Sequence, residues 1–365
     1  MNPTFWQGKQ VLVTGHTGFK GAWLCMLLDS FGARVAGYAL DPPTHPSLYE
    51  LARVDELVDS TVGDVRDLKP LSERVRAFAP GFVFHMAAQS VVLRSYDDPV
   101  ETYSTNVLGT VHVLEAVRRM GRPCTVINVT TDKCYENKGQ VNGYREGDAL
   151  GGHDPYSNSK ACAELVGDAY RESFFPLNRR NDHGVGLASA RAGNVIGGGD
   201  WTARQLVPDT IASFLQSQAV VLRHPQAVRP WQHVLDCLAG YLTLAEALAE
   251  DVEAYSGAWN FGPTASDSRP VSYVVETLAA HWGTDITWVK DGAHHAPEEE
   301  ILRLDVTKAA KFLGWRSRLP IDDALRWVAH WYRDFNRGSH ARDLCHEHIG
   351  AYLQLSPPLP SNGRA

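Results

Sequence analysis

The segment that decides the fold lies near the start of the chain, where residues 10–32 read QVLVTGHTGFKGAWLCMLLDSFG. A short apolar run is followed by a turn with three glycines and then by an apolar stretch of helix length. Glycines in such a turn let the backbone bend tightly and approach a pyrophosphate, and the free amides at the helix start attract phosphate. The segment therefore predicts a dinucleotide-binding strand, turn and helix, although an ordinary strand-to-helix turn can also carry glycines.

The spacing of these glycines is GxxGxxG, whereas classical dehydrogenases use GxGxxG. Its position after the first strand favours cofactor binding over a plain turn. The candidate contacts in this turn are Gly15, Thr17, Gly18, Phe19, Lys20 and Gly21.

Further strand-like runs continue the pattern through the first half of the chain. Stretches of helix length separate them, and they are Gln10–Thr14, Arg34–Tyr38, Ser60–Val62, Phe82–His85, Thr125–Val129 and Gly186–Ala190. Short apolar runs that alternate with helices are typical of βαβ units and a parallel sheet. We therefore predict an α/β fold with a doubly wound Rossmann sheet, whose ligand crevice lies at the carboxyl ends of the strands.

Apolar residues recur every three or four positions in Pro99–Met120, which predicts one long helix. A second helix is expected to begin at Pro155, because proline is favoured in the first helical turn. Beyond residue 191 a glycine-rich loop is followed by further expected helices near Pro208–Gln218, Val234–Glu250, Val271–Trp282 and Ile321–Arg337. These later elements indicate a smaller α/β unit that closes over the first.

Bulk composition excludes several classes of partner. A chain of 365 residues with a net charge of −7 suggests two domains and gives no electrostatic reason to bind nucleic acid or an anionic membrane. The N-terminus does not resemble a signal peptide, and no apolar run is long enough to span a membrane. The six scattered cysteines indicate reduced thiols in a cytoplasmic protein, and we expect no metal site, not even at His294-His295.

Other candidate cofactor contacts follow the later strands. Asp41, near the end of the second strand, could bond an adenosine ribose hydroxyl, but an Asp before Pro is equally common in a plain turn. No Arg or Lys stands there to pair a 2′-phosphate, which favours NAD over NADP. The remaining candidates, for which packing is an equally good explanation, are Asp64, Val65, Ala87, Ala88, Gln89 and Asn106.

The most informative pentapeptide is YSNSK, which runs from Tyr156 to Lys160. Residues i and i+4 share one helix face, so the Lys160 ammonium can lie beside the Tyr156 phenol. A free tyrosine has a pKa near ~10, and a neighbouring cation together with a charged nicotinamide favours its phenolate. Because Thr131 follows the fifth strand, it can hydrogen-bond the substrate oxygen that Tyr156 deprotonates.

Together the glycine motif, Thr131, Tyr156 and Lys160 resemble the extended short-chain dehydrogenase/reductase family, over nearly the whole chain. The segments HTGFKGAWL, FHMAAQ, TTDKCYEN, DPYSNSKACAEL and RAGNVIGGGDW are most similar to its CDP-glucose 4,6-dehydratases. The resemblance implies an NAD-binding Rossmann domain at 1–190, a nucleotide-sugar-binding domain at 191–350 and a mobile tail at 351–365. The chain is expected to cross between the two domains.

The resemblance also implies a lyase reaction with three steps, namely oxidation at C4 of the hexose, elimination of water across C5 and C6, and return of hydride to C6. Elimination needs a base and an acid near the sugar, and Asp132-Lys133 directly follows Thr131. Asp132 is the expected acid toward the C6 oxygen and Lys133 the expected base at C5. Related dTDP-sugar dehydratases carry Asp-Glu here, so the split of roles stays a hypothesis, and a solvated ion pair is the alternative.

On the substrate side, the resemblance points to Arg191, Asn194 and the glycine run at 197–199. Asn194 and Arg229 are the candidate diphosphate contacts, since a guanidinium can bind two phosphate oxygens at once. Ser90 and Arg94 could reach the hexose. A surface ion pair is the alternative for Arg229.

Two competing functions remain open. One is a UDP-N-acetylhexosamine 4,6-dehydratase, which also uses an Asp-Lys pair, and the other is a non-catalytic NAD-binding regulator. The resemblance further implies a homodimer or dimer of dimers, built from helices that include Pro99–Met120, although burial within a monomer would explain their apolar faces equally well. It also implies deoxysugar supply for lipopolysaccharide O-antigen.

Overall fold

The computed structural model describes residues 1–140, 142–264, 267–293 and 302–356. Its centre is a seven-stranded sheet in the order β11-β6-β5-β4-β1-β2-β3, and every neighbouring pair is parallel. The strands are β1 Gln10–Thr14, β2 Arg34–Ala39, β3 Asp59–Val62, β4 Phe82–His85, β5 Cys124–Val129, β6 Val185–Ala192 and β11 Gly257–Phe261. The predicted α/β class and the six predicted strands are confirmed, each strand to within two residues at either end.

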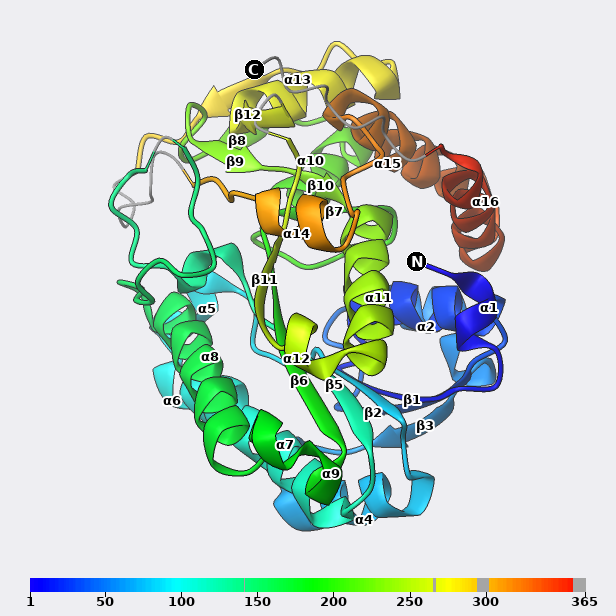
Figure 1. The fold of residues 1–365 in the computed structure, drawn as a ribbon. Helices are drawn as coiled ribbons and strands as arrows, with labels where there is room; N and C mark the ends of the chain where they lie inside the picture. The colour runs from blue at the N-terminus through cyan, green and yellow to red at the C-terminus, as the bar shows by residue number, and fades with distance from the viewer. Residues whose placement is uncertain (141, 265–266, 294–301, 357–365) are drawn as a thin grey trace.

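Side chains of the central strands point alternately into two cores. Val11 and Val13 on β1 pack with α2 (Phe19–Ser30) and α11 (Val234–Glu250), whereas Leu12 packs with helices of the opposite face. That opposite face is covered by α4 (Leu68–Phe78), α7 (Gly109–Met120) and α8 (Pro155–Ser173). Figure 1 shows the sheet between these two helix layers. Burial on both faces explains why the central strands β1 and β4 are mostly apolar instead of alternating in polarity, whereas the edge strand β3 is largely exposed.

The predicted single helix Pro99–Met120 is interrupted. The structure has α6 at Pro99–Tyr103, one π-helical turn at Ser104–Leu108 and then α7. A π-turn accommodates one extra residue and is common at functional sites. Here it holds the buried side chain of Asn106 toward the loop that follows β4. Periodicity alone could not predict this break, because the apolar spacing continues through it.

The later half of the chain forms three small two-stranded sheets, β10-β7, β12-β9 and β13-β8, and returns one strand, β11, to the main sheet. The small strands are β7 Val195–Ile196, β8 Val220–Leu222, β9 Val228–Pro230, β10 Gln232–His233, β12 Ser268–Pro270 and β13 Trp288–Lys290. The later helices are α10 Leu206–Leu215, α12 Val252–Tyr255, α13 Val271–Trp282, α14 Thr307–Phe312, α15 Ile321–Asn336 and α16 Ala341–Gln354. Short helices elsewhere are α1 Pro3–Trp6, α3 Leu48–Leu51, α5 Val92–Asp97 and α9 Arg180–His183. The expected division near residue 190 stays a prediction.

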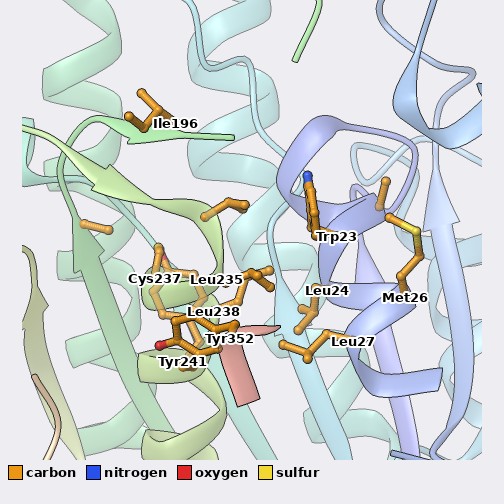
Figure 2. Close-up of a cluster of buried hydrophobic side chains, with 14 of the residues drawn as sticks. Trp23, Leu24, Met26, Leu27, Ile196, Leu235, Cys237, Leu238, Tyr241 and Tyr352 are labelled. Carbon is orange, nitrogen blue, oxygen red and sulfur yellow. The ribbon is translucent and has the colours of Figure 1, made fainter. Parts of the chain in front are cut away.

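The C-terminal helices pack directly on α2, the helix that the glycine turn opens. Figure 2 shows Trp23 on α2 and the neighbouring side chains of α11, with Tyr352 of α16 in the same cluster. The Trp23 indole donates a hydrogen bond to the carbonyl of Gly198 (3.0 Å), in the loop after β7. The candidate cofactor and substrate segments therefore share one core.

Among the described residues, no helix is long and apolar enough to cross a membrane, and no group of three His, Cys, Asp or Glu side chains could hold a metal ion. All six cysteines are free thiols. The His294-His295 pair and most of the tail predicted at 351–365 lie outside the described residues, which end at 356, and α16 continues through Gln354.

Candidate active site

The glycine turn brings β1 close to the loop after β4. Gly15 has a left-handed φ of +74°, and a Cβ there would lie 2.7 Å from the amide nitrogen of Ala87. A Cβ on Gly21 would lie only 2.2 Å from the carbonyl oxygen of Gly15, so the first turn of α2 packs flat against the loop. Gly18 caps α2 without a side-chain hydrogen bond, which leaves the first amides of the helix available. This cradle fits the pyrophosphate of a dinucleotide.

The side chain of His16 fastens the turn to the second and third strands. Its Nε2 lies 2.7 Å from Ser60 Oγ on β3, and a Cβ on Gly37 of β2 would lie 2.3 Å from its ring. Burial lowers the pKa of His16 to about 4, so the ring is neutral at physiological pH. Gly37 is therefore needed to admit a neutral histidine beneath the cofactor turn.

The two aspartates that are candidate cofactor contacts, Asp41 and Asp64, differ in their surroundings. Asp41 is exposed just beyond β2, beside Leu40, whose carbonyl accepts a hydrogen bond from Thr17 Oγ1 (2.9 Å). The carboxylate of Asp64 instead forms a two-pronged ion pair with Arg66, with Nε 2.9 Å and Nη2 2.5 Å from Oδ2. That hydrogen bonding lowers the Asp64 pKa. Asp41 thus lies open to a ligand, whereas the carboxylate of Asp64 is bound within the protein.

Val65 and the residues after β4 lie in packed surroundings. Val65 is buried against Gly109 of α7, at a distance that leaves no space for a Cβ on the glycine. Ala87 donates its amide to Thr14 Oγ1 (3.2 Å), and Ala88 is half-buried beside it.

Gln89 and Asn106 hold the loop after β4 against α8. The Asn106 amide accepts from the Gln89 backbone N–H (2.9 Å) and donates to the Gln89 carbonyl (3.0 Å). Its Nδ2 also donates to Ser159 Oγ on α8 (2.9 Å). The π-turn therefore ties the floor of the crevice to the YSNSK segment.

α8 presents Tyr156 and Lys160 toward the end of β5. Asp154 caps the helix by accepting from the Ser157 amide (2.9 Å), and the Tyr156 amide donates to Ser95 Oγ of α5 (3.1 Å). The Lys160 ammonium donates to the carbonyl of Val129, the last residue of β5 (3.1 Å). These contacts fix the starting turn of α8 over the carboxyl edge of the sheet.

Burial shifts the pKa values of Tyr156 and Lys160 in opposite directions. Burial raises the Tyr156 pKa above its usual value, while a hydrogen bond with Thr131 acts in the opposite direction. Burial and the positive charge of Lys20 together lower the pKa of Lys160 to about 8, against the opposing negative charge of Glu164. Without a ligand, Tyr156 is therefore a neutral phenol at neutral pH.

Asp132 and Lys133 begin a short 3-10 helix, Asp132–Cys134. The Asp132 carboxyl group is buried; Oδ1 accepts from Thr131 Oγ1 (3.1 Å), and Oδ2 has no hydrogen-bond partner among the described residues. Burial raises its pKa, and the nearby positive charges of Lys133 and Arg229 oppose that rise. Lys133 is half-buried. A buried carboxyl group that favours its proton can serve as a general acid.

The Arg191 side chain is hydrogen-bonded within the protein. Its guanidinium is buried and makes four hydrogen bonds within the protein, two to Glu164 (3.0 Å each), one to Tyr135 and one to the Glu146 carbonyl. A group so fully bonded has no free edge for a diphosphate. The expectation that Arg191 contacts substrate stays a prediction, and in this structure its guanidinium holds Glu164, Tyr135 and Glu146 together.

The glycine run 197–199 is also a packing feature. A Cβ on Gly198 would lie 2.1 Å from the Trp331 ring, and one on Gly199, whose φ is +81°, would lie 2.6 Å from Leu48. This run is buried and packs against Trp331 of α15, and its expected contact with substrate stays a prediction.

The other substrate candidates lie in two places. Asn194 is half-buried after β6, and its carbonyl accepts from Gln232 (2.9 Å); Arg229 is buried on β9 and contributes positive charge at Asp132. Ser90 is exposed after β4, and Arg94 forms an exposed ion pair with Glu101 (2.8 Å). Arg229 is thus the predicted substrate residue whose charge reaches Asp132.

Sequence reasoning missed Glu164 and Tyr135, which lie at the centre of a buried polar network. Glu164 follows Tyr156 and Lys160 at the spacing i, i+4, i+8, so a continuous polar stripe on an otherwise buried helix face was the available signal. Tyr135 carried no such signal, because its contacts come from distant parts of the chain.

Three comparisons bear on this arrangement. Residues 12–328 match the family model described as GDP-mannose 4,6 dehydratase. The chain is 48% identical over 356 residues, 98% of this chain and 99% of the relative, to a CDP-glucose 4,6-dehydratase of Salmonella typhimurium strain LT2.

Solved structures agree with the fold. A dTDP-glucose 4,6-dehydratase from Streptomyces venezuelae with NAD bound matches with a TM-score of 0.75 and 26% identity, over 90% of this chain and 98% of that one. A UDP-glucose 4-epimerase from Thermotoga maritima with UDP-glucose has a TM-score of 0.77 at 20% identity, covering 90% and 99% of the two chains, and supports the fold alone.

Proposed function

The chain belongs to the GDP-mannose 4,6-dehydratase family, and on that premise we propose that it converts CDP-D-glucose to CDP-4-dehydro-6-deoxy-D-glucose and water. The observation that carries the dehydratase assignment is the buried Asp132 carboxyl group, bonded to Thr131 at the carboxyl edge of β5. An epimerase has no elimination step and needs no such acid. The 48% identity to a CDP-glucose 4,6-dehydratase supports CDP over UDP as the nucleotide.

NAD fits the cradle between β1 and α2. Gly15 and Gly18 give the backbone access to the pyrophosphate, Lys20 brings positive charge toward Lys160, and exposed Asp41 is placed to meet the ribose. When bound, NAD would supply the redox chemistry, in which a hydride leaves C4 of the hexose and later returns to C6. In this proposal further residues line or support the same cradle, namely Thr17, Phe19, Gly21, Ala87, Ala88 and Gln89.

Tyr156 removes the proton of the C4 hydroxyl in the oxidation. Thr131 acts on this phenol by lowering its pKa, and it orients the substrate oxygen in this proposal. Lys160, anchored on the Val129 carbonyl, holds a positive charge beside the phenolate that forms. Burial alone would keep Tyr156 protonated, so its activation depends on positive charge brought near it on binding.

Lys133 and Asp132 carry out the elimination. The C5 proton is acidic once C4 is a ketone, and the Lys133 amine takes that proton as the C5–C6 double bond forms. The ammonium so formed exchanges with solvent and gives a proton back to C5 when hydride returns to C6. Asp132 gives its own proton to the departing C6 hydroxyl, which leaves as water. The raised pKa of Asp132 supports this role, because a carboxyl group must be protonated to act as an acid.

The nucleotide diphosphate is bound on the far side of the hexose, with Arg229 and Asn194 as the proposed contacts. The proposal for Arg229 is supported by its positive charge, which acts on the pKa of Asp132. Ser90 stays a proposed hexose contact. The Arg94 side chain would have to leave Glu101 to reach the sugar.

We also propose a homodimer, in a protein of the cytoplasm. Large apolar side chains are exposed along α6, the π-turn and α8, namely Val100, Tyr103, Leu108 and Leu165, and exposed apolar patches mark interfaces. Six free thiols suit a reducing compartment. In this proposal the product is a precursor of a deoxysugar for lipopolysaccharide O-antigen.

The decisive test incubates the purified protein with NAD and CDP-glucose in deuterated water, followed by mass spectrometry. Loss of water with one solvent deuteron at C5 is the expected result. Turnover of a UDP- or dTDP-sugar, but not CDP-glucose, would keep the mechanism and replace the substrate. NAD binding without turnover of any nucleotide-sugar would favour a regulator.

A further inference from the structure

A buried polar network crosses from α8 to the segment after β5 that carries Asp132. Glu164 on α8 and Arg191 on β6 form an ion pair with two hydrogen bonds of 3.0 Å, and both side chains are almost fully buried. The hydroxyl of Thr130 donates to Glu164 Oε1. Arg191 Nη1 donates to the hydroxyl of Tyr135 (2.9 Å).

The network continues to the outer strand of the sheet. The Tyr135 hydroxyl donates to the side-chain oxygen of Asn260 on β11 (2.7 Å), and Asn260 Nδ2 donates to the carbonyl of Tyr144 (2.8 Å). The guanidinium of Arg191 also lies over the Tyr135 ring, 4.9 Å from its centroid. Tyr135 is therefore held by a charged group on one side and by the sheet on the other.

The positions of Thr130 and Tyr135 in the chain indicate which segment this network holds in place. They flank the segment 131–134, which contains Thr131, Asp132 and Lys133. Glu164 binds the residue just before that segment, and Arg191 binds the residue just after it. Glu164 also lies on the same helix as Tyr156 and Lys160.

We propose that the Glu164–Arg191 ion pair is a clamp that positions the elimination residues Asp132 and Lys133 relative to Tyr156 and Lys160. The inference rests on the proposed dehydratase function and extends it to residues that do not touch the sugar. Two successive reactions at C4 and at C5–C6 must occur on one bound hexose. A small displacement of the acid and base from the site of oxidation slows elimination strongly, because proton transfer requires hydrogen-bonding distance.

Two conservative substitutions at the ends of the clamp test it while leaving the buried ion pair in place. Thr130→Val removes the hydroxyl that binds Glu164, and Tyr135→Phe removes the hydroxyl that binds Arg191, while each keeps nearly the same volume. Changing Glu164 itself would leave Arg191 buried and unpaired, which can prevent folding. Tyr352→Phe is the matched control, since it deletes another buried tyrosine hydroxyl, bonded to Asp236 (2.8 Å), outside the network.

The measurement is the ratio of two products formed from CDP-glucose in the presence of NAD. One is CDP-4-dehydroglucose, which is oxidised at C4 but keeps its C6 hydroxyl, and the other is the dehydrated 6-deoxy product. Each clamp variant should raise the share of the undehydrated ketone by roughly tenfold over the wild-type protein. The control should keep the wild-type ratio, and thermal unfolding of all three variants shows which of them are folded.

A loss of stability alone would lower oxidation and elimination together and leave the ratio unchanged. Clamp variants that fold and keep the wild-type ratio would overturn the inference while leaving the proposed function intact. A wild-type protein that turns over no nucleotide-sugar would overturn the function, and the clamp with it. The double variant provides a second check, because two ends of one clamp should give effects that do not add.

Discussion

The hydroxyl of Thr131 donates a hydrogen bond to the carboxyl group of Asp132 (3.1 Å). These neighbours belong to different half-reactions in the proposed mechanism, since Thr131 serves oxidation at C4 and Asp132 serves elimination at C6. The side chain of Thr131 also acts on Tyr156, where it lowers the pKa of the phenol against the effect of burial. The base of the first step and the acid of the second are therefore connected through one hydroxyl group.

Replacing Asp132 with Asn should separate the two half-reactions. The amide preserves size but cannot donate the proton that the C6 hydroxyl needs, so elimination should slow by about 10²–10⁴-fold while oxidation at C4 persists. Chromatography with mass spectrometry should find CDP-4-dehydroglucose in place of the 6-deoxy product. Full dehydration by D132N would refute the assignment of Asp132 as the acid.

Tyr156→Phe should block the oxidation at C4, which precedes the elimination. Without the phenol no group removes the C4 hydroxyl proton, so neither the ketone nor the dehydrated product should accumulate, with rates reduced by about 10²–10⁴-fold. NAD affinity, followed by isothermal titration calorimetry, should stay near that of the wild-type protein. Tyr255→Phe, which loses a surface hydroxyl bonded to Phe312 (3.3 Å), is the control and should remain active.

Gly198→Ala tests whether the glycine run is a packing feature. The added Cβ would lie 2.1 Å from Trp331, and such overpacking typically costs about 1–3 kcal/mol of folding free energy. Urea unfolding should detect that loss, with the KM for CDP-glucose unchanged. Gly350→Ala adds a Cβ where no atom lies within 4 Å, and it should not destabilise the protein. A raised KM without destabilisation would instead indicate substrate contact.

Acid should weaken the fold through His16. Burial holds its folded pKa at about 4, whereas an unfolded histidine has a pKa near ~6.5. The unfolded chain then binds a proton between these values and the folded protein does not, so stability is lost as pH falls from ~6.5 toward ~4. At about pH 5 the loss due to His16 is about 2 kcal/mol.

Urea midpoints measured across this pH range provide the test. His16→Gln should flatten the dependence, and His340→Gln, at an exposed position, should leave it unchanged. An equal slope in H16Q and the wild-type protein would contradict the role assigned to His16.

The proposed dimer depends on apolar side chains that are exposed in the single chain. Val100 is 77% exposed and Leu165 is 55% exposed, so a charge at either position would have to be buried when two copies associate. V100E and L165E should each shift the protein to a monomer in size-exclusion chromatography with light scattering. Val62→Glu, at another exposed apolar position on β3, should not. A monomeric wild-type protein at micromolar concentration would rule the dimer out.

Local patterns were enough to predict most of the fold. The limits of β1 and β4 and those of α11 and α13 match the predicted ranges residue by residue, because apolar runs and helical spacing mark buried elements directly. The YSNSK segment was likewise predicted to begin a helix, and α8 starts at Pro155.

Elements whose stability depends on distant partners were missed. β11 is a short strand that pairs with β6, and α16 was not predicted although Leu344, Cys345, Ile349 and Tyr352 recur on its buried face. The partners of Arg191 were missed for the same reason. Its ion pair with Glu164 joins two separate elements, so it is visible only in three dimensions.

The strand order also constrains how the protein can be made. β6 at Val185–Ala192 receives its outer neighbour only when β11 at Gly257–Phe261 has left the ribosome, and α11 covers β5 and β6 only after residue 250. Until then a nascent chain carries an unpaired sheet edge and a bare apolar face, both of which promote aggregation. The completed sheet is thus a late product of synthesis, and fragments that stop near residue 190 should depend on chaperones for their solubility.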